Sequence, residues 1–168
     1  MLFRSMIKED TSDLKYKYLG KGVFGKCYLT PGRMVYKEFN FKLPDKIYDN
    51  ITRISQIEND SFVLPSILIY KNQVSIDDFL GYIMRYSKGI DFDHIFESTE
   101  MEKFILALVK LEIDMKKLSE EKFQIYDFKA ANVLYTKDDK IDVLDPDLYV
   151  YNDALNAEDV LKCNLMEL

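Results

Sequence analysis

Four polar residues in the last third of the chain are of types that can do chemistry on a phosphate group. Asp127, Lys129 and Asn132 follow one another closely, and Asp145 ends the apolar stretch that comes after them. An aspartate can accept a proton from a hydroxyl group, and a lysine can neutralise a phosphoryl group during transfer. Asparagine and aspartate oxygens suit Mg²⁺. The structural alternative is that Asp and Asn cap turns, and that the lysine is solvated.

Glycines near the N-terminus form a second group, in the stretch "LGKGVFGKCYL". Gly20, Gly22 and Gly25 have the spacing GxGxxG. Glycine has no Cβ atom, so a backbone rich in it can bring N–H groups close to phosphates. Because the stretch leads back into a strand and not into a helix, it predicts a β-hairpin over phosphates instead of a dinucleotide-binding turn. A glycine-rich hairpin without a ligand is the alternative.

A lysine stands among apolar residues in the strand that follows. In "MVYKEF", the alternation of a strand places Val35, Lys37 and Phe39 on one face, which we expect to be the inner face. A lysine in that position needs an anion nearby. We therefore expect Lys37 to contact an acidic group.

The acid that the sequence offers is Glu58. It continues the apolar spacing of a helix expected over residues 44–58, whose inward residues are Ile47, Ile51 and Ile54. A buried lysine and a buried glutamate are each costly alone and far less so as a pair, so we expect Lys37 and Glu58 to meet. The alternative is a glutamate at the helix end that is turned to water.

Strands and helices alternate in a way that predicts an α+β fold. A long amphipathic helix is the clearest prediction, over residues 98–118. A last helix is expected to begin at Asn156, with Asp159 completing its cap, and to cover the core with Ala157, Val160, Leu161 and Leu165. Strands are expected over residues 15–19, 26–29, 34–39, 63–70, 80–86, 133–135 and 140–144.

Composition narrows the class of protein. The chain has 168 residues, 48% of them hydrophobic, which is enough for one domain with a real core. Its net charge of −6 argues against binding a nucleic acid. We expect no signal peptide and no membrane span, and therefore a cytoplasmic location, since no run of 18 apolar residues occurs. Cys27 and Cys163 are too far apart in sequence and too few to indicate a disulfide framework or a zinc site.

Together these motifs resemble the protein kinase superfamily, in the family's order and over residues 15–147. The glycine stretch and "MVYK" are similar to the family's glycine loop and lysine strand, and Glu58 to its helix glutamate. "YIMRYSKG" is similar to a hinge, "IYDFKAAN" to the catalytic loop, and "LDPD" to the metal-binding motif. The resemblance implies a two-lobed fold, with an N-terminal antiparallel sheet and one helix over about residues 1–84, and a reduced helical lobe over about residues 85–168.

The resemblance also implies ATP and Mg²⁺ as ligands, with a role for each residue. Lys37, oriented by Glu58, would hold the α- and β-phosphates, Asp127 would position the acceptor hydroxyl, and Lys129 would stabilise the transferring group. Asn132 and Asp145 would bind Mg²⁺. The remaining nucleotide contacts would come from Gly20, Gly22, Gly25, Cys27, Val35, Met84, Arg85, Tyr86, Ser87 and Leu134.

Departures from the family pattern keep two functions open. Ile125 and Tyr126 replace the usual His and Arg, Pro146 and Asp147 replace Phe and Gly, and few residues follow Asp145. The first function is transfer of the ATP γ-phosphate to a hydroxyl of a protein or small-molecule acceptor. The alternative is a non-catalytic, pseudokinase-like module that binds a nucleotide and regulates a partner protein, and nucleotidyl transfer is a weaker third possibility.

Overall fold

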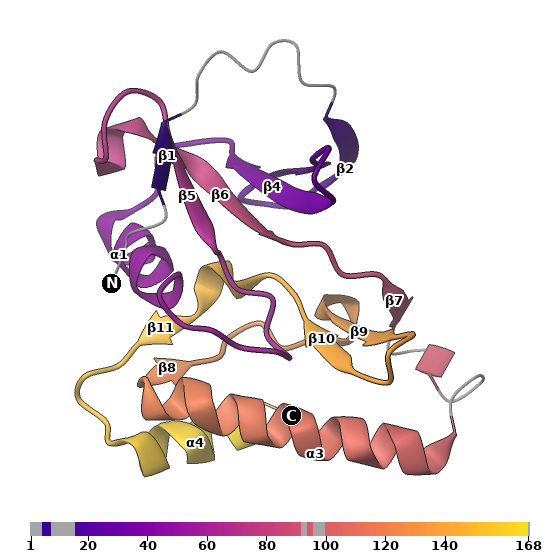
Figure 1. Cartoon of the computed structure of the whole chain (residues 1–168). Coiled ribbons are helices and arrows are strands. Elements are labelled where there is room, and N and C mark those ends of the chain that lie inside the picture. The colour runs from indigo at the N-terminus through magenta and orange to yellow at the C-terminus, as the bar shows by residue number, and fades with distance from the viewer. Residues whose placement is uncertain (1–4, 8–15, 92–93, 96–99, 168) are drawn as a thin grey trace. The chain divides into compact units, whose positions relative to one another are not determined.

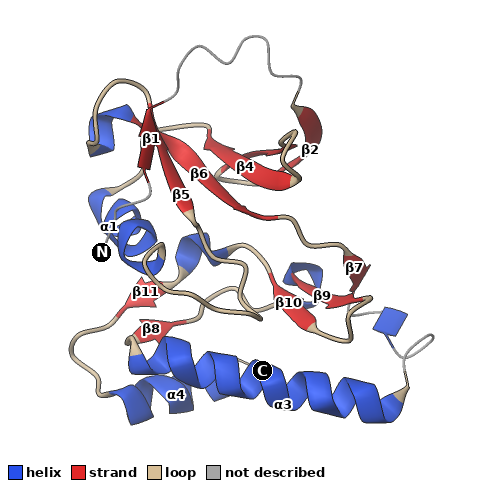
Figure 2. Ribbon diagram, in the orientation of Figure 1, coloured by secondary structure: helices blue, strands red, loops and turns tan. Residues whose placement is uncertain are grey.

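The structure of the chain is a computed structural model, which describes residues 5–7, 16–91, 94–95 and 100–167. It has the mixed α+β composition that the sequence predicts (Figure 2). The chain divides into two compact units. The first contains residues 1–56 and 65–86, and the second contains residues 57–64 and 87–168.

The first unit is built on a six-stranded sheet with the strand order β1-β5-β6-β4-β3-β2 (Figure 1). The neighbouring strands from β5 to β2 are antiparallel, whereas β1 lies parallel to β5. The strands are β1 (Ser5–Ile7), β2 (Lys17–Lys21), β3 (Gly25–Leu29), β4 (Met34–Phe39), β5 (Ile67–Tyr70) and β6 (Phe79–Arg85).

The α-helix α1 (Asp45–Ile54) belongs to this unit and contacts the sheet through Tyr48. The Tyr48 ring packs edge-on against Phe79, with 5.2 Å between ring centroids, and its hydroxyl lies 3.1 Å from the hydroxyl of Tyr70. Ile51 and Ile54 are buried, as their spacing predicts.

The expected helix over residues 44–58 is wrong at its C-terminal end, because α1 ends at Ile54. Ser55 donates its hydroxyl to the carbonyl of Thr52 at 2.8 Å, and the side chain of Asn59 accepts the N–H groups of Ser61 and Phe62. Such short polar side chains compete with helical backbone hydrogen bonds and favour turns. Glu58 therefore lies beyond the helix, and it is exposed.

The described part of the second unit contains two small sheets, one long helix and one shorter helix. One sheet has the order β10-β9-β7 and the other pairs β11 with β8. The strands are β7 (Gly89–Asp91), β8 (Phe123–Gln124), β9 (Val133–Thr136), β10 (Ile141–Val143) and β11 (Val150–Tyr151), and the helices are α3 (Met101–Glu120) and α4 (Ala157–Leu165).

Helix α3 confirms the clearest sequence prediction and forms much of this unit's core. Its buried apolar residues are Phe104, Ala107, Leu111, Met115 and Leu118. None of the helices among the described residues is long and apolar enough to cross a membrane.

A buried carboxylate on α3 holds the segment of residues 57–64 in this unit. Asp114 accepts hydrogen bonds from Lys110 and Lys117, each at 2.9 Å, and from Ser61 at 2.8 Å. Burial by itself would raise the pKa of Asp114, but the hydrogen bonds from Lys117, Lys110 and Ser61 outweigh burial and hold this pKa below its ordinary value. The segment that contains Glu58 is thus tied to α3 at Ser61.

Helix α4 begins as the sequence predicts. Asn156 is its N-cap and accepts the N–H of Asp159 at 3.0 Å. Val160 is fully buried, as expected, but Leu165 is 40% exposed, so the expectation that Leu165 covers the core is wrong. The buried position near the end of α4 belongs instead to Asn164.

The remaining differences from the sequence prediction are one strand that is shorter than expected and four short strands that were not expected. Only residues 67–70 of the expected strand 63–70 form one, and β1, β7, β8 and β11 were not expected. These unexpected strands have only two or three residues each, too short for an alternating pattern to show. The expected strand residue Lys15 and the expected helix residues 98–99 lie outside the described residues.

Candidate functional site

The glycine stretch forms the hairpin that its sequence predicts. Gly20 is part of β2, Gly25 is the first residue of β3, and the N–H of Gly22 donates to the carbonyl of Gly25 at 2.9 Å. Antiparallel pairing of β2 with β3 continues on both sides of Gly20. The chain therefore returns into the same sheet and does not enter a helix.

The three glycines differ in what the fold requires of them. A Cβ atom at Gly25 would lie 2.2 Å from the carbonyl oxygen of Glu38, so the close packing of β3 on β4 demands glycine there. A Cβ atom at Gly20 or Gly22 would meet no atom within 4 Å. Steric packing among the described residues therefore accounts for a glycine at position 25 but not at positions 20 and 22.

Lys37 is buried on β4, as expected, with 6% of its surface exposed. It lies directly across from Cys27 on β3 and from Tyr82 on β6. Val35, two residues earlier on the same face, lies across from Met84. The sheet thus brings Cys27, Val35, Lys37 and Met84 to one face, where the apolar members surround the lysine.

The expected hinge residues lie at the C-terminal end of β6 and just after it. Arg85 is the last residue of that strand and Tyr86 is exposed. Ser87 is the first residue of the longer segment of the second unit, residues 87–168. Its hydroxyl is buried and has no hydrogen-bond partner among the described residues.

Asp127, Lys129 and Asn132 come together in the second unit, in the loop between β8 and β9. Lys129 Nζ lies 2.6 Å from Asp127 Oδ2. Asn132 Nδ2 donates to the carbonyl oxygen of Asp127 at 3.1 Å and lies 3.4 Å from its Oδ2. One carboxylate is therefore contacted by both a cationic and an amide side chain, as the spacing D-x-K-x-x-N allows.

Asp145 is linked to this loop through the backbone. The N–H of its neighbour Leu144 donates to the carbonyl of Asn132 at 2.7 Å. Both Asp127 and Asp145 have a φ of 62°, in the left-handed region that few residues other than glycine adopt. Aspartate is among the residues that tolerate this conformation best, and backbone strain of this kind gathers at functional sites.

Tyr149 is a member of this site that sequence reasoning missed. It is buried, and its ring packs edge-on against Phe62, with 6.1 Å between centroids. Burial raises the pKa of its hydroxyl far above the usual range, and the charges of Asp145 and Asp127 raise the pKa further. The hydroxyl of Tyr149 therefore stays neutral, and the negative charges of both aspartates contribute to its raised pKa. No local pattern indicates this, because the 3-10 turn η4 (Pro146–Leu148) carries Tyr149 back into the core.

Asn164 of α4 is a second residue that the sequence did not indicate. It is fully buried, and its Oδ1 accepts the N–H of Ile125 at 2.8 Å. Its Nδ2 donates to the carbonyl of Phe123 and to the hydroxyl of Ser119, both at 2.9 Å. Helix α4 thus holds the backbone two residues before Asp127.

The other predicted site residues take separate positions. Leu134 lies half-buried in β9, across from Asp142 of β10 and Asp91 of β7. Glu58 is on the exposed segment after α1, so the expectation that it points inward from a helix is wrong. Its pairing with Lys37 stays a prediction.

The donor atoms near Asp127 suit Mg²⁺. Asn132 uses Nδ2 for its hydrogen bonds, so the structure gives its oxygen no partner among the described residues. Asp145 directly follows Leu144, whose N–H donates to the carbonyl of Asn132. The described residues contain no group of three or more His, Cys, Asp or Glu side chains with the geometry of a metal site. Mg²⁺ does not need one, since it commonly takes one or two protein oxygens together with phosphates and water.

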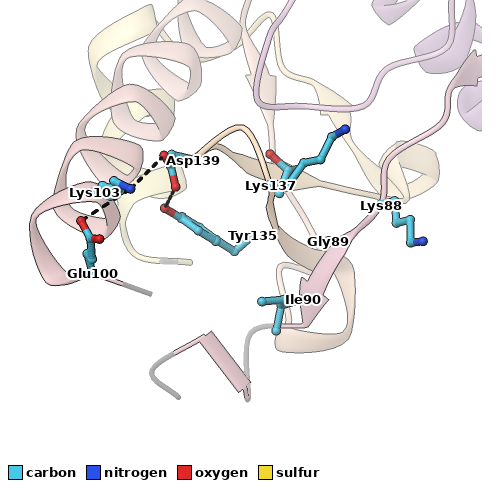
Figure 3. A pocket seen from close by; sticks show the side chains of 9 residues that line it. Lys88, Gly89, Ile90, Glu100, Lys103, Tyr135, Lys137 and Asp139 are labelled. Atoms are coloured by element: carbon cyan, nitrogen blue, oxygen red, sulfur yellow. Dashed lines mark hydrogen bonds and ion pairs between the residues drawn. The ribbon is translucent and has the colours of Figure 1, made fainter. Parts of the chain in front are cut away.

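A cavity of about 570 Å³ in the second unit lies elsewhere, at the end of β9 farthest from Asn132 (Figure 3). Tyr135 donates its hydroxyl to Asp139 at 2.8 Å, and Lys103 lies 3.5 Å from Glu100 and 3.8 Å from Asp139. The labelled Lys88 and Lys137 point away from this group. No predicted site residue lines this cavity.

Comparison of the chain with protein-family models and with curated proteins found no match.

Proposed function

We propose that the chain is an ATP-dependent phosphotransferase with a protein-kinase-like fold, which moves the γ-phosphate of ATP to a hydroxyl of a protein or small-molecule acceptor. The observation that carries the proposal is the grouping around the Asp127 carboxylate, with Lys129 at 2.6 Å and Asn132 at 3.4 Å. Catalysis of phosphoryl transfer rests mainly on positioning and on electrostatic stabilisation by charged groups. The loop with Asp127 and Lys129 would supply such charged groups.

The proposal assigns a role to residues of each unit by itself. In the first, buried Lys37 would bind phosphate oxygens, and the hairpin at Gly20 and Gly22 leaves its backbone open to a ligand. In the second, Asp127 would orient the acceptor hydroxyl and accept its proton. Asn132 and Asp145 would hold Mg²⁺, which supplies positive charge against the phosphates when it is bound.

The order of elements supports the kinase-like fold. The first unit contains a hairpin with glycines, a strand with a buried lysine, a helix and two further strands, and β1 adds a sixth strand parallel to β5. The loop with Asp127 and the hairpin of β9 and β10, which ends just before Asp145, follow in the second. A cytoplasmic location, where ATP and Mg²⁺ are both available, accords with the proposal.

One observation favours the alternative, a nucleotide-binding module without catalysis. The carboxylate of Asp127 is already paired with Lys129 in the absence of an acceptor, and Glu58 is exposed. Under this alternative, the chain would bind the nucleotide through Lys37 and regulate a partner protein.

The test combines γ-labelled ATP with a thermal-shift measurement, both with Mg²⁺. We expect ATP at about 100 times its dissociation constant to stabilise the protein by about 2.7 kcal/mol, and the label to appear on the chain or an added acceptor. Stabilisation without transfer to the chain or to a panel of protein and small-molecule acceptors would select the non-catalytic alternative. Absence of both would refute the nucleotide-site proposal.

A further inference from the structure

The solvent-facing side of α3 carries an apolar surface that the proposed function does not use. Ile105, Val109 and Ile113 are each about half exposed, at 51%, 49% and 50%, and Leu106 is 69% exposed. These residues lie on the side of the helix opposite its buried residues, such as Leu111 and Leu118. Four large apolar side chains exposed on one side of a helix are a candidate interaction surface. We call Glu102, Ile105, Val109, Ile113 and Lys116 the α3 stripe.

The spacing of the α3 stripe is symmetric about its centre. From Glu102 to Lys116 its members are separated by 3, 4, 4 and 3 residues, with Val109 in the middle. Spacings of three and four residues place side chains on one face of a helix. The residue types match across the centre: isoleucine stands four residues to either side of Val109, and opposite charges stand seven residues to either side.

We propose that the α3 stripe is the interface of a homodimer, in which α3 packs antiparallel against α3 of a second copy of this chain. In a two-fold symmetric contact, residue i meets residue j and residue j meets residue i. If the two-fold axis passes through Val109, Val109 meets Val109 of the second copy. Ile105 then meets Ile113 and Glu102 meets Lys116, and each of these two contacts forms twice. Neither Glu102 nor Lys116 forms an ion pair within the part of the chain that the structure describes.

Charge complementarity selects the second copy and the direction of packing. A parallel pair in register would place Glu102 against Glu102 and Lys116 against Lys116, which is unfavourable. In the antiparallel pair, each Glu102 lies against a Lys116 of the other copy, so both contacts join opposite charges. A single helix face from each copy is a small interface, so we expect weak association with a dissociation constant in the micromolar range or above. The proposal depends on α3 alone and not on the proposed catalytic activity.

Sedimentation velocity over a concentration series up to the millimolar range tests the association. We expect Glu102→Lys and Lys116→Glu each to weaken dimerisation by about tenfold or more, since each places like charges together twice. The double variant Glu102→Lys/Lys116→Glu should restore it. Lys71→Glu, an exposed charge reversal in the first unit, is the matched control and should leave association unchanged. A wild-type chain that remains monomeric throughout, or a double variant that is no better than the singles, would overturn the proposal.

Cysteine cross-linking tests the geometry. Val109→Cys places two thiols at the two-fold axis, so mild oxidation should yield a covalent dimer. In Ile113→Cys the two thiols would stand roughly 12 Å apart along the helices, so this variant should not cross-link to itself. A mixture of Ile105→Cys and Ile113→Cys chains should form the mixed dimer. All variants keep Cys27 and Cys163, so their differences report on α3. Equal cross-linking at positions 109 and 113 would contradict the antiparallel arrangement.

Discussion

Asp127 is the residue on which the proposed chemistry depends most. Its backbone is in the left-handed region, and its carboxylate is oriented by Lys129 and Asn132. Both contacts come from residues within the same short loop, so the geometry of the group is local. Removing the carboxylate should therefore change the chemistry more than the fold.

We predict that Asp127→Ala lowers the rate of phosphate transfer by about 10²- to 10⁴-fold, the usual contribution of a general base, while ATP binding is nearly unchanged. Asp145→Ala should lose both transfer and the Mg²⁺ dependence of ATP binding. Single-turnover kinetics and calorimetric titration measure the two effects. Equal loss of ATP binding in both variants would contradict the separate roles assigned to these residues.

The glycines of the hairpin offer a second comparison at this scale. Gly20→Ala and Gly22→Ala should leave thermal stability unchanged but weaken ATP binding, because the added methyl group meets no described protein atom and would face a ligand. Gly25→Ala should destabilise the fold, since its Cβ atom would clash with the carbonyl of Glu38. Melting temperatures and ATP titrations measure this. Unchanged ATP affinity in both Gly20→Ala and Gly22→Ala would indicate a hairpin without a ligand.

At the scale of elements, α4 supports the loop that carries Asp127. The link is Asn164, which satisfies the backbone of β8 and of Ile125 from within the core. A buried polar group that loses its partner costs free energy, so this contact couples the end of α4 to the loop that carries Asp127.

We predict that Asn164→Ala lowers the free energy of unfolding by about 1–3 kcal/mol, because it leaves the N–H of Ile125 and the carbonyl of Phe123 unsatisfied. Lys162→Ala is the matched control on the same helix. It removes exposed ion pairs to Glu158 and Asp159 and should cost less than about 1 kcal/mol. Urea denaturation measures both variants, and an equal effect of the two would show that Asn164 is not an anchor.

Helix α3 holds the segment of residues 57–64 through Asp114, and this contact should depend on pH. The pKa of Asp114 is lower in the folded protein than its ordinary value of 3.8, so the unfolded chain binds more protons near and below pH 4. Its stabilising effect is complete above the ordinary pKa and is lost as the pH falls through the lowered folded pKa.

We predict that Asp114→Asn is less stable than wild type at neutral pH and loses less stability when the pH falls below about 4, since its side chain has no proton to bind. Asp153→Asn, which removes an exposed carboxylate, should keep the wild-type pH dependence. Denaturant midpoints between pH 2 and pH 7 measure this. Parallel pH profiles for wild type and Asp114→Asn would contradict the assignment.

At the scale of the whole molecule, the structure leaves little of the segment between Asp145 and α4 available for regulation by phosphorylation. Its hydroxyl-bearing side chains are Tyr149 and Tyr151. Tyr149 is buried against Phe62, and Tyr151 is half-buried with its ring against Phe123. Under the proposed kinase-like fold, Tyr126 would take the place of the arginine on which such regulation depends.

We therefore predict that the unmodified chain needs no phosphorylation to become active. Phosphatase treatment should leave the rate of transfer unchanged, and Tyr151→Phe should retain it. Intact-mass spectrometry before and after treatment confirms the state of the chain. A rate that appears only after phosphorylation would contradict this prediction.

The sequence by itself determined the features that arise from neighbouring residues. Alternation within "MVYKEF" indicated the buried side of Lys37, the spacing of apolar residues indicated α3, and Asn156 indicated the start of α4. The grouping of Asp127, Lys129 and Asn132 also follows from short spacing, because all three belong to one loop. Such features need only local backbone geometry, which sequence patterns report well.

Only the tertiary structure decided the features that depend on residues far apart in the chain. The segment that carries the exposed Glu58 is held by a long-range bond from Ser61 to Asp114. The contact of the Tyr149 ring with Phe62 and the anchor from Asn164 to Ile125 join elements separated by many residues. Helical periodicity continues past a helix end whenever the next residues happen to match it, and a buried polar residue has no local pattern of its own. The positions of Glu58, Tyr149 and Asn164 depend on tertiary contacts, which sequence periodicity does not predict.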